Sequence, residues 1–129
     1  MVQKTTKKGA DFESKKRWLK RYLKTLEKID RLSFREHDLL RSQIDDDLLQ
    51  DIQDHKKTLL DQVGGLYDET IGAINQLRCA KEREALTLFF INGHSFKEIA
   101  TRIHYSERQV IRYYVSGVNN VELKVVSEM

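Results

Sequence analysis

The chain contains no proline in 129 residues, and this absence constrains its fold more than any other feature. Proline ends or kinks helices and occupies the corners of many turns. Turn-rich sandwiches and barrels usually need proline and far more than the six glycines present here. Charged residues make up 33% of the chain, and the abundance of Lys, Glu, Asp and Leu favours helix. The sequence therefore predicts an all-α fold.

The length and the remaining composition exclude several protein classes. A chain of this size forms one or two small domains. No apolar run approaches the roughly 18–20 residues of a membrane span, and the first sixteen residues lack the apolar segment of a secretory signal. Cys79 is the only cysteine, which rules out an intramolecular disulfide, and we interpret it as a small buried residue. We expect a soluble, cytoplasmic protein with no membrane partner.

The net charge of +3 conceals a strong asymmetry along the chain. Residues 1–36 contain twelve basic and five acidic side chains, giving +7, whereas residues 37–79 contain four basic and nine acidic ones, giving −5. Residues 80–129 are nearly neutral at +1. Such a basic block often contacts phosphate or another acidic surface, although a solvated helix face explains it equally well.

The first 79 residues predict a long helical hairpin with a basic N-terminal tail over residues 1–10. A first helix is expected from Asp11 or Ser14, with Trp18 as a core residue, and residues 33–42 are expected to form a connection with a short helical turn. A long helix then begins near Asp45, Asp46 and Asp47, because acidic residues suit the positive end of the helix dipole.

The apolar residues of this second helix are spaced by three and four positions. They are Leu48, Leu49, Ile52, Leu59, Leu60, Val63, Tyr67, Ile71, Ile74 and Leu77. Gly64 and Gly65 interrupt the pattern, and we expect a kinked or continuous helix there. This stripe could close within the chain or pack against another copy of it. Because a long apolar stripe on a short chain has few internal partners, we expect a homo-oligomer, a dimer being favoured.

Residues 80–129 predict a separate three-helix domain of the helix-turn-helix type. A helix over residues 82–92 precedes Gly93, the residue type expected where a helix ends in a left-handed conformation. Ser95 and Glu98 form one capping box, His104 and Tyr105 fill a turn, and Ser106 with Gln109 forms a second box. Phe96, Ile99, Ala100, Ile103, Val110, Tyr114 and Val118 are expected to point inward.

The helix Ser106–Val118 carries on its outer face the residue types that contact DNA bases. Arginine pairs with guanine, glutamine with adenine, and an apolar side chain meets the thymine methyl. Two residues of the preceding helix are candidates for contacts with the phosphate backbone. The candidate DNA-binding residues are Lys97, Arg102, Ser106, Glu107, Arg108, Gln109, Ile111, Arg112 and Tyr113. We therefore expect a sequence-specific protein that binds double-stranded DNA in the major groove.

The order of residues from Phe96 to Val110, FKEIATRIHYSERQV, resembles region four of primary-type sigma factors. The layout, a helical part followed by such a domain, is similar to small phage-encoded regulators of the ArpU and RinA type. This resemblance implies an activator of phage or mobile-element genes. Region four of sigma factors also contacts polymerase, which makes an interaction module on RNA polymerase one alternative. A small terminase-like DNA-packaging subunit is the other.

Neither catalysis nor a bound cofactor is indicated by the sequence. His37, His55, His94 and His104 lack metal-ligand spacing. The acidic residues around 45–54 lack the glycine and terminal glutamate of a calcium-binding loop, and a solvated helix face explains them. No phosphate-binding glycine loop or nucleophile elbow is present. We expect a protein that is not an enzyme and uses no metal.

Overall fold

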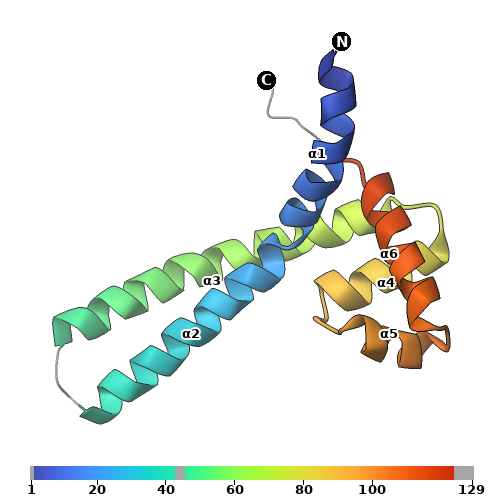
Figure 1. The fold of residues 1–129 in the computed structure, drawn as a ribbon. Helices are drawn as coiled ribbons and strands as arrows, with labels where there is room; N and C mark the ends of the chain where they lie inside the picture. The colour runs from blue at the N-terminus through green and yellow to red at the C-terminus, as the bar shows by residue number, and fades with distance from the viewer. Residues whose placement is uncertain (1, 43–45, 124–129) are drawn as a thin grey trace.

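The computed structural model describes residues 2–42 and 46–123, and the described chain is all-helical (Figure 1). Six helices follow one another along it. They are α1 (Val2–Leu19), α2 (Arg21–Ser42), α3 (Asp46–Asn75), α4 (Ala80–Phe90), α5 (Phe96–Ile103) and α6 (Glu107–Asn120). The predicted all-α fold is confirmed. The backbone of residues 2–10, expected as a tail, belongs to α1.

A sharp bend at Lys20 divides the first predicted helix into α1 and α2 (Figure 1). At this bend the Arg21 side chain takes part in the helical hydrogen-bond ladder, because its Nε donates to the Trp18 carbonyl oxygen at 3.0 Å. A side chain inserted into the helical hydrogen-bond ladder is a known cause of kinks. The same guanidinium stacks 4.4 Å from the centre of the Trp18 ring and pairs with Glu69 of α3 at 2.6 Å.

Helices α2 and α3 lie side by side and antiparallel, forming the long arm of the molecule (Figure 1). Tyr22 at the start of α2 contacts Tyr67 in the second half of α3, whereas Glu36 near the end of α2 pairs with Lys56 at 2.7 Å. The inward-facing residues follow the alternating three- and four-residue spacing of coiled coils. On α3 they are Leu49, Ile52, Lys56, Leu59, Val63, Leu66, Thr70 and Ala73.

The end of α2 and the course of α3 differ in part from what the sequence predicts. Residues 33–42 were expected to form a connection, but they are the last part of α2. Tertiary contacts decide this, because Glu36 accepts from both Lys56 and Gln53 and so keeps α2 against α3. Helix α3 runs without interruption through Gly64 and Gly65, as one of the two expected alternatives allowed. It begins at Asp46, while Asp45 lies outside the described residues.

Helices α4, α5 and α6 pack into a compact unit beside the base of the arm (Figure 1). A small cluster of Ile99, Ala100, Ile103 and Val110 fills the space between α5 and α6. A larger core also takes in residues from the N-terminal half of the chain. Its buried members are Leu19, Ile74, Leu77, Leu86, Phe90, Tyr114, Val118 and Val121. One hydrophobic core therefore spans the expected domain boundary at residue 79.

Helix α1 closes this core by packing against α6. Phe12 and Trp18 are partly buried against it, and Lys15 Nζ donates to the Asn119 carbonyl oxygen at 2.8 Å. Trp18 therefore packs against the core, as expected, but its side chain is only partly buried. Over the described part of the chain, none of the helices has the length and apolar character needed to cross a membrane.

Candidate nucleic-acid interface

The N-terminus of α5 is fixed by the capping box that the sequence predicts. The Ser95 hydroxyl accepts from the Glu98 amide at 3.1 Å, and Glu98 Oε1 accepts from the Ser95 amide at 2.9 Å. This backbone hydrogen bond, followed by one from His94, holds the pKa of Glu98 below its usual value of 4.5. The two reciprocal bonds satisfy amide groups that a helix start leaves without partners.

Two residues with left-handed backbone conformations set the turns on either side of α5. Gly93 has a φ of 71°, confirming the expected helix end after α4. His104 adopts φ 61° and ψ 44° at the end of α5, where its amide donates to the Ala100 carbonyl oxygen. A left-handed residue at this position ends a helix sharply. The chain therefore reverses within His104 and Tyr105 before α6 begins.

Helix α6 begins with Ser106 as its cap, whose hydroxyl accepts from the Gln109 amide at 3.1 Å. The expected second capping box is only half formed, because among the described contacts Gln109 does not return a bond to Ser106. Val110, Tyr114 and Val118 are buried, as predicted from their spacing. Tyr114 lies in a ring cluster with Phe89, Phe90 and Phe96, and burial raises the pKa of its hydroxyl.

The nine candidate DNA-binding residues lie on α5, on α6 and at the cap of α6, and none of them is fully buried. Seven of them are exposed: Lys97, Arg102, Ser106, Glu107, Arg108, Ile111 and Arg112. Gln109 and Tyr113 are half-buried at the edge of this surface. Tyr113 makes an edge-on contact with Tyr105, with ring centres 5.7 Å apart. The first two turns of α6 are therefore presented to solvent with their base-contacting residue types outward.

The cations of this surface are available to a ligand. Arg108 and Arg112 form no ion pair with any described residue, and the same holds for Lys97 and Arg102. The free amide groups at the N-terminus of α6 add partial positive charge, which favours phosphate. Glu107 brings one negative charge and the ability to accept from a cytosine amino group.

A residue that the sequence analysis did not single out sets the position of α6. Glu82 of α4 is buried, and its carboxylate accepts from Ser116 Oγ at 2.5 Å and from Asn120 Nδ2 at 3.2 Å. These bonds tie α4 to the last turns of α6. Its spacing from Ala85, Leu86 and Phe89 places Glu82 on the buried face of α4, and this could have identified it.

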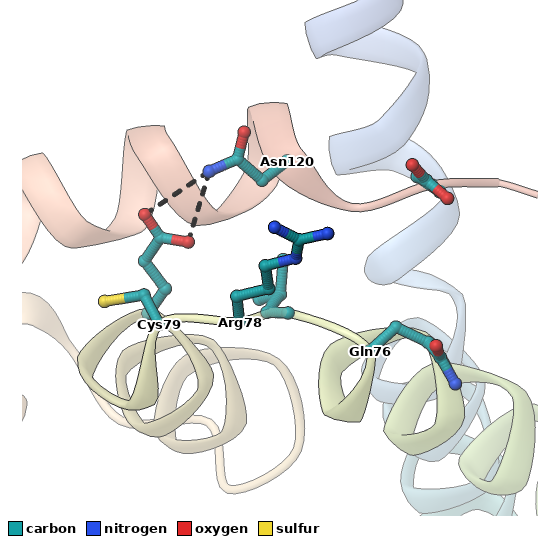
Figure 2. A pocket seen from close by; sticks show the side chains of 7 residues that line it. Gln76, Arg78, Cys79 and Asn120 are labelled. Atoms are coloured by element: carbon teal, nitrogen blue, oxygen red, sulfur yellow. Dashed lines mark hydrogen bonds between the residues drawn. The ribbon is translucent and has the colours of Figure 1, made fainter.

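An open cleft lies beside Glu82, between the α3–α4 connection and the end of α6 (Figure 2). It has a volume of about 540 Å³ and is lined by Gln76, Leu77, Arg78, Cys79, Glu82, Asn120 and Glu122. Figure 2 shows the Asn120 amide directed at the Glu82 carboxylate. Cys79 is half-buried rather than buried, because it lies at the N-cap position of α4 on the wall of the cleft, where its side chain makes no capping hydrogen bond. Within residues 2–42 and 46–123, no cluster of His, Cys, Asp and Glu suits a metal ion.

No family model matches the chain, and neither a curated protein nor a solved structure matches it significantly. The chemistry of the α5–α6 surface is therefore the basis for assigning a function.

Proposed function

We propose that this protein is a sequence-specific DNA-binding regulator of transcription that places the N-terminal half of α6 in the major groove. The observation that carries the proposal is the pair Arg108 and Arg112, exposed one turn apart on a capped helix and free of ion pairs with the described residues. A recognition helix needs its first turns exposed and rigidly held.

Each side chain of the surface has a role that follows from its chemistry. Arg108 and Arg112 pair with guanine, Gln109 with adenine, and Ile111 packs against a thymine methyl. Lys97, Arg102 and Tyr113, together with the amide groups at Ser106, bind phosphate and fix the orientation of the protein on the duplex. Glu107 selects a cytosine amino group.

The biological setting is proposed from the resemblance of residues 96–110 to sigma region four. This resemblance supports a cytoplasmic activator of phage or mobile-element genes rather than an enzyme. The proposed mechanism uses no cofactor. The alternative function is a contact with RNA polymerase in place of DNA, and it is supported by Ile111 and Val115, which are exposed one turn apart on α6.

The test begins by selecting bound duplexes from a random pool and titrating the best one. Arg108→Ala and Arg112→Ala should each weaken binding to this duplex by about 1–3 kcal/mol, and the double variant should no longer distinguish it from random DNA. The matched control is Arg41→Ala with Lys57→Ala, which removes two exposed cations from the arm. If the Arg108/Arg112 double variant still bound the selected duplex more tightly than random DNA, the α5–α6 surface would not be the site of base recognition.

A second measurement separates base contacts from phosphate contacts. Lys97→Ala and Arg102→Ala should weaken binding about equally for selected and random duplexes, because phosphates carry no sequence information. Each should also lower the slope of log affinity against log salt by about one. Recovery of RNA polymerase in a stable complex, without DNA binding, would instead favour the interaction module.

A further inference from the structure

A row of four cations runs along one edge of the α2–α3 arm. Lys24, Lys28, Arg31 and Arg35 recur at four-, three- and four-residue spacing, which places them along one side of α2. All four are exposed, and none of them forms an ion pair or a side-chain hydrogen bond with a described residue. We call this set the basic row. Its four charges are therefore available to an anionic partner.

The side of α3 that lies beside the basic row carries little negative charge. Arg21 stands one turn before Lys24 on the same side of α2, and its bond to Glu69 identifies the adjoining side of α3. Counting back from Glu69 at helical spacing, the exposed residues of that side are Gln62, Thr58 and His55. The next acidic residue there is Asp51, near the tip of the arm. A ligand on the basic row therefore meets mostly uncharged side chains of α3.

The acidic residues of α2 leave the row unpaired. Glu27, Asp30 and Asp38 are exposed on the same helix, but within the described chain none of them is within ion-pair distance of a cation of the row. Exposed charges that are not held in pairs are screened by salt and contribute little to stability. The row is thus better explained by an external partner than by a role in folding.

The aspartates of α3 lie on the other edge of the arm. Asp54 and Asp61 each follow by two positions a residue that is buried in the arm, Ile52 and Leu59 respectively. Two positions turn a helix by about 200°, so both aspartates point away from α2. The width of two helices, about 20 Å, separates them from the basic row. This distance exceeds two screening lengths at physiological ionic strength, so these aspartates do not repel an anion bound on the basic row.

The packing of α2 disfavours a membrane surface as the partner. Thr25 and Ile29 are buried in the arm, so the apolar side of α2 is not free to enter a bilayer. The large apolar residues exposed on α2 are Phe34 and Leu40, six positions apart, and they form no stripe. A helix that lies in a membrane interface needs an exposed apolar face.

The spacing of the row suits the phosphates of a duplex. Lys24 and Arg35 are eleven positions apart, or about 16 Å along the helix. One strand of a duplex places about five phosphates over that length. Both the lysine ammonium and the arginine guanidinium bind phosphate oxygens, the guanidinium through two parallel hydrogen bonds.

We infer that the basic row binds the phosphate backbone of double-stranded DNA, as a second and sequence-independent contact surface outside α5 and α6. The choice of DNA among linear polyanions rests on the proposed function. The contact adds affinity for any duplex and no preference among sequences, because phosphates carry no sequence information.

A salt titration of the full chain against random-sequence duplexes tests the row, with fluorescence anisotropy as the readout. Lys28→Gln with Arg31→Gln should reduce the slope of log affinity against log salt by about two, because two phosphate contacts are lost. At about 0.1 M salt the affinity should fall roughly tenfold or more. The matched control is Arg41→Gln with Lys57→Gln, which removes two exposed cations of α2 and α3 outside the row and should leave the slope unchanged. Circular dichroism confirms that both variants stay helical.

Two further comparisons locate the contact. Asp54→Asn with Asp61→Asn should change duplex affinity by less than about twofold, because these aspartates lie on the screened edge of the arm. The Lys28/Arg31 variant should keep the wild-type ratio of affinities for selected and random duplexes.

An unchanged salt slope in the Lys28/Arg31 variant, or an equal loss of slope in the Arg41/Lys57 control, would overturn the inference. Tighter binding of the wild-type chain to phosphatidylserine vesicles than to duplexes would assign the row to a membrane instead. A lower mass of the Lys28/Arg31 variant in solution, with duplex affinity unchanged, would assign it to a second copy of the chain.

The same measurements separate this inference from the proposed function. If the Lys28/Arg31 variant loses salt slope while Arg108→Ala with Arg112→Ala keeps discrimination, the basic row stands and the α5–α6 assignment fails. The opposite pair of results retains the recognition helix and removes the basic row. A wild-type chain that binds no duplex would overturn both.

Discussion

At the scale of single residues, Arg21 and Glu82 hold helices in place through groups far apart in the sequence. Arg21 joins the Trp18 carbonyl, the Trp18 ring and Glu69, fixing both the bend before α2 and its contact with α3. Glu82 is buried, and it accepts hydrogen bonds from two residues of α6. A buried charge is tolerated only where such partners exist, so the bonds of Glu82 also fix where α6 lies against α4.

The two serine caps should contribute measurably to stability. Ser95→Ala and Ser106→Ala should each lower the free energy of unfolding by about 1 kcal/mol, because each leaves a backbone amide without its acceptor. Ser95→Ala should cost more, since it also disturbs the reciprocal bond from Glu98. Urea denaturation measures both, with exposed Thr101→Ala as the control. Equal stability of all three variants would contradict the cap assignment.

The capping carboxylate should make stability depend on acid pH. The folded-state pKa of Glu98 is lowered from 4.5, so its contribution is complete above pH 4.5 and disappears as the pH falls through the folded value. The Tm difference between wild type and Glu98→Gln should therefore be present at pH 6 and shrink below pH 4.5. Glu27→Gln serves as control, because Glu27 is exposed and accepts no hydrogen bond from described residues. A difference that is constant with pH would disprove this role.

At the scale of elements, the α2–α3 arm is an antiparallel pair with a polar layer that helps to set its register, together with the Arg21–Glu69 pair near its base. Glu36 and Lys56 occupy positions of the otherwise mostly apolar seam and bond at 2.7 Å. The bonds from Lys56 and Gln53 lower the pKa of Glu36. Sliding one helix by a turn would separate this pair, which is how a polar pair in a seam specifies alignment.

Two glycines in different helices should respond in opposite ways to alanine. A Cβ at Gly64 would have no neighbour within 4 Å, so Gly64→Ala should raise stability by up to about 1 kcal/mol through helix propensity. A Cβ at Gly117 would lie 3.1 Å from two atoms of Leu86, which is fully buried. Gly117→Ala should lower stability by about 1–2 kcal/mol, because the α4–α6 contact becomes overpacked. Thermal denaturation compares the two, and an equal shift of the same sign would refute the close approach at Gly117.

At the scale of the whole molecule, the arm and the α4–α6 unit share one core. Ile74 of the arm and Leu77, just after α3, belong to the same core as Phe90, Tyr114 and Val118 of the C-terminal helices. The surface proposed to bind DNA therefore depends for its shape on residues that a division at residue 79 would remove. The chain should unfold as a single cooperative unit.

Truncation of Ile74 tests this cooperativity. Ile74 is fully buried, so Ile74→Ala should lower the free energy of unfolding by about 2–5 kcal/mol. Helicity and the near-ultraviolet signal of the Tyr114 ring cluster should be lost in one shared transition. Ile111→Ala, which removes an exposed apolar side chain, should change stability by less than about 0.5 kcal/mol. Separate transitions for the two signals would show that the C-terminal helices fold alone.

The sequence by itself determined the all-α fold, the Ser95 box, the turn at Gly93, and the inward and outward faces of α5 and α6. These features depend on residue types within four positions of one another, where local hydrogen bonds and spacing decide the outcome. Only the tertiary structure decided the bend at Lys20, the extension of α2 to Ser42 and the anchoring of α6 by Glu82. The extension of α2 and the anchoring of α6 depend on contacts between residues 17 or more positions apart. The bend involves a side chain that bonds to a backbone carbonyl. The local spacing of residue types predicts neither kind of contact.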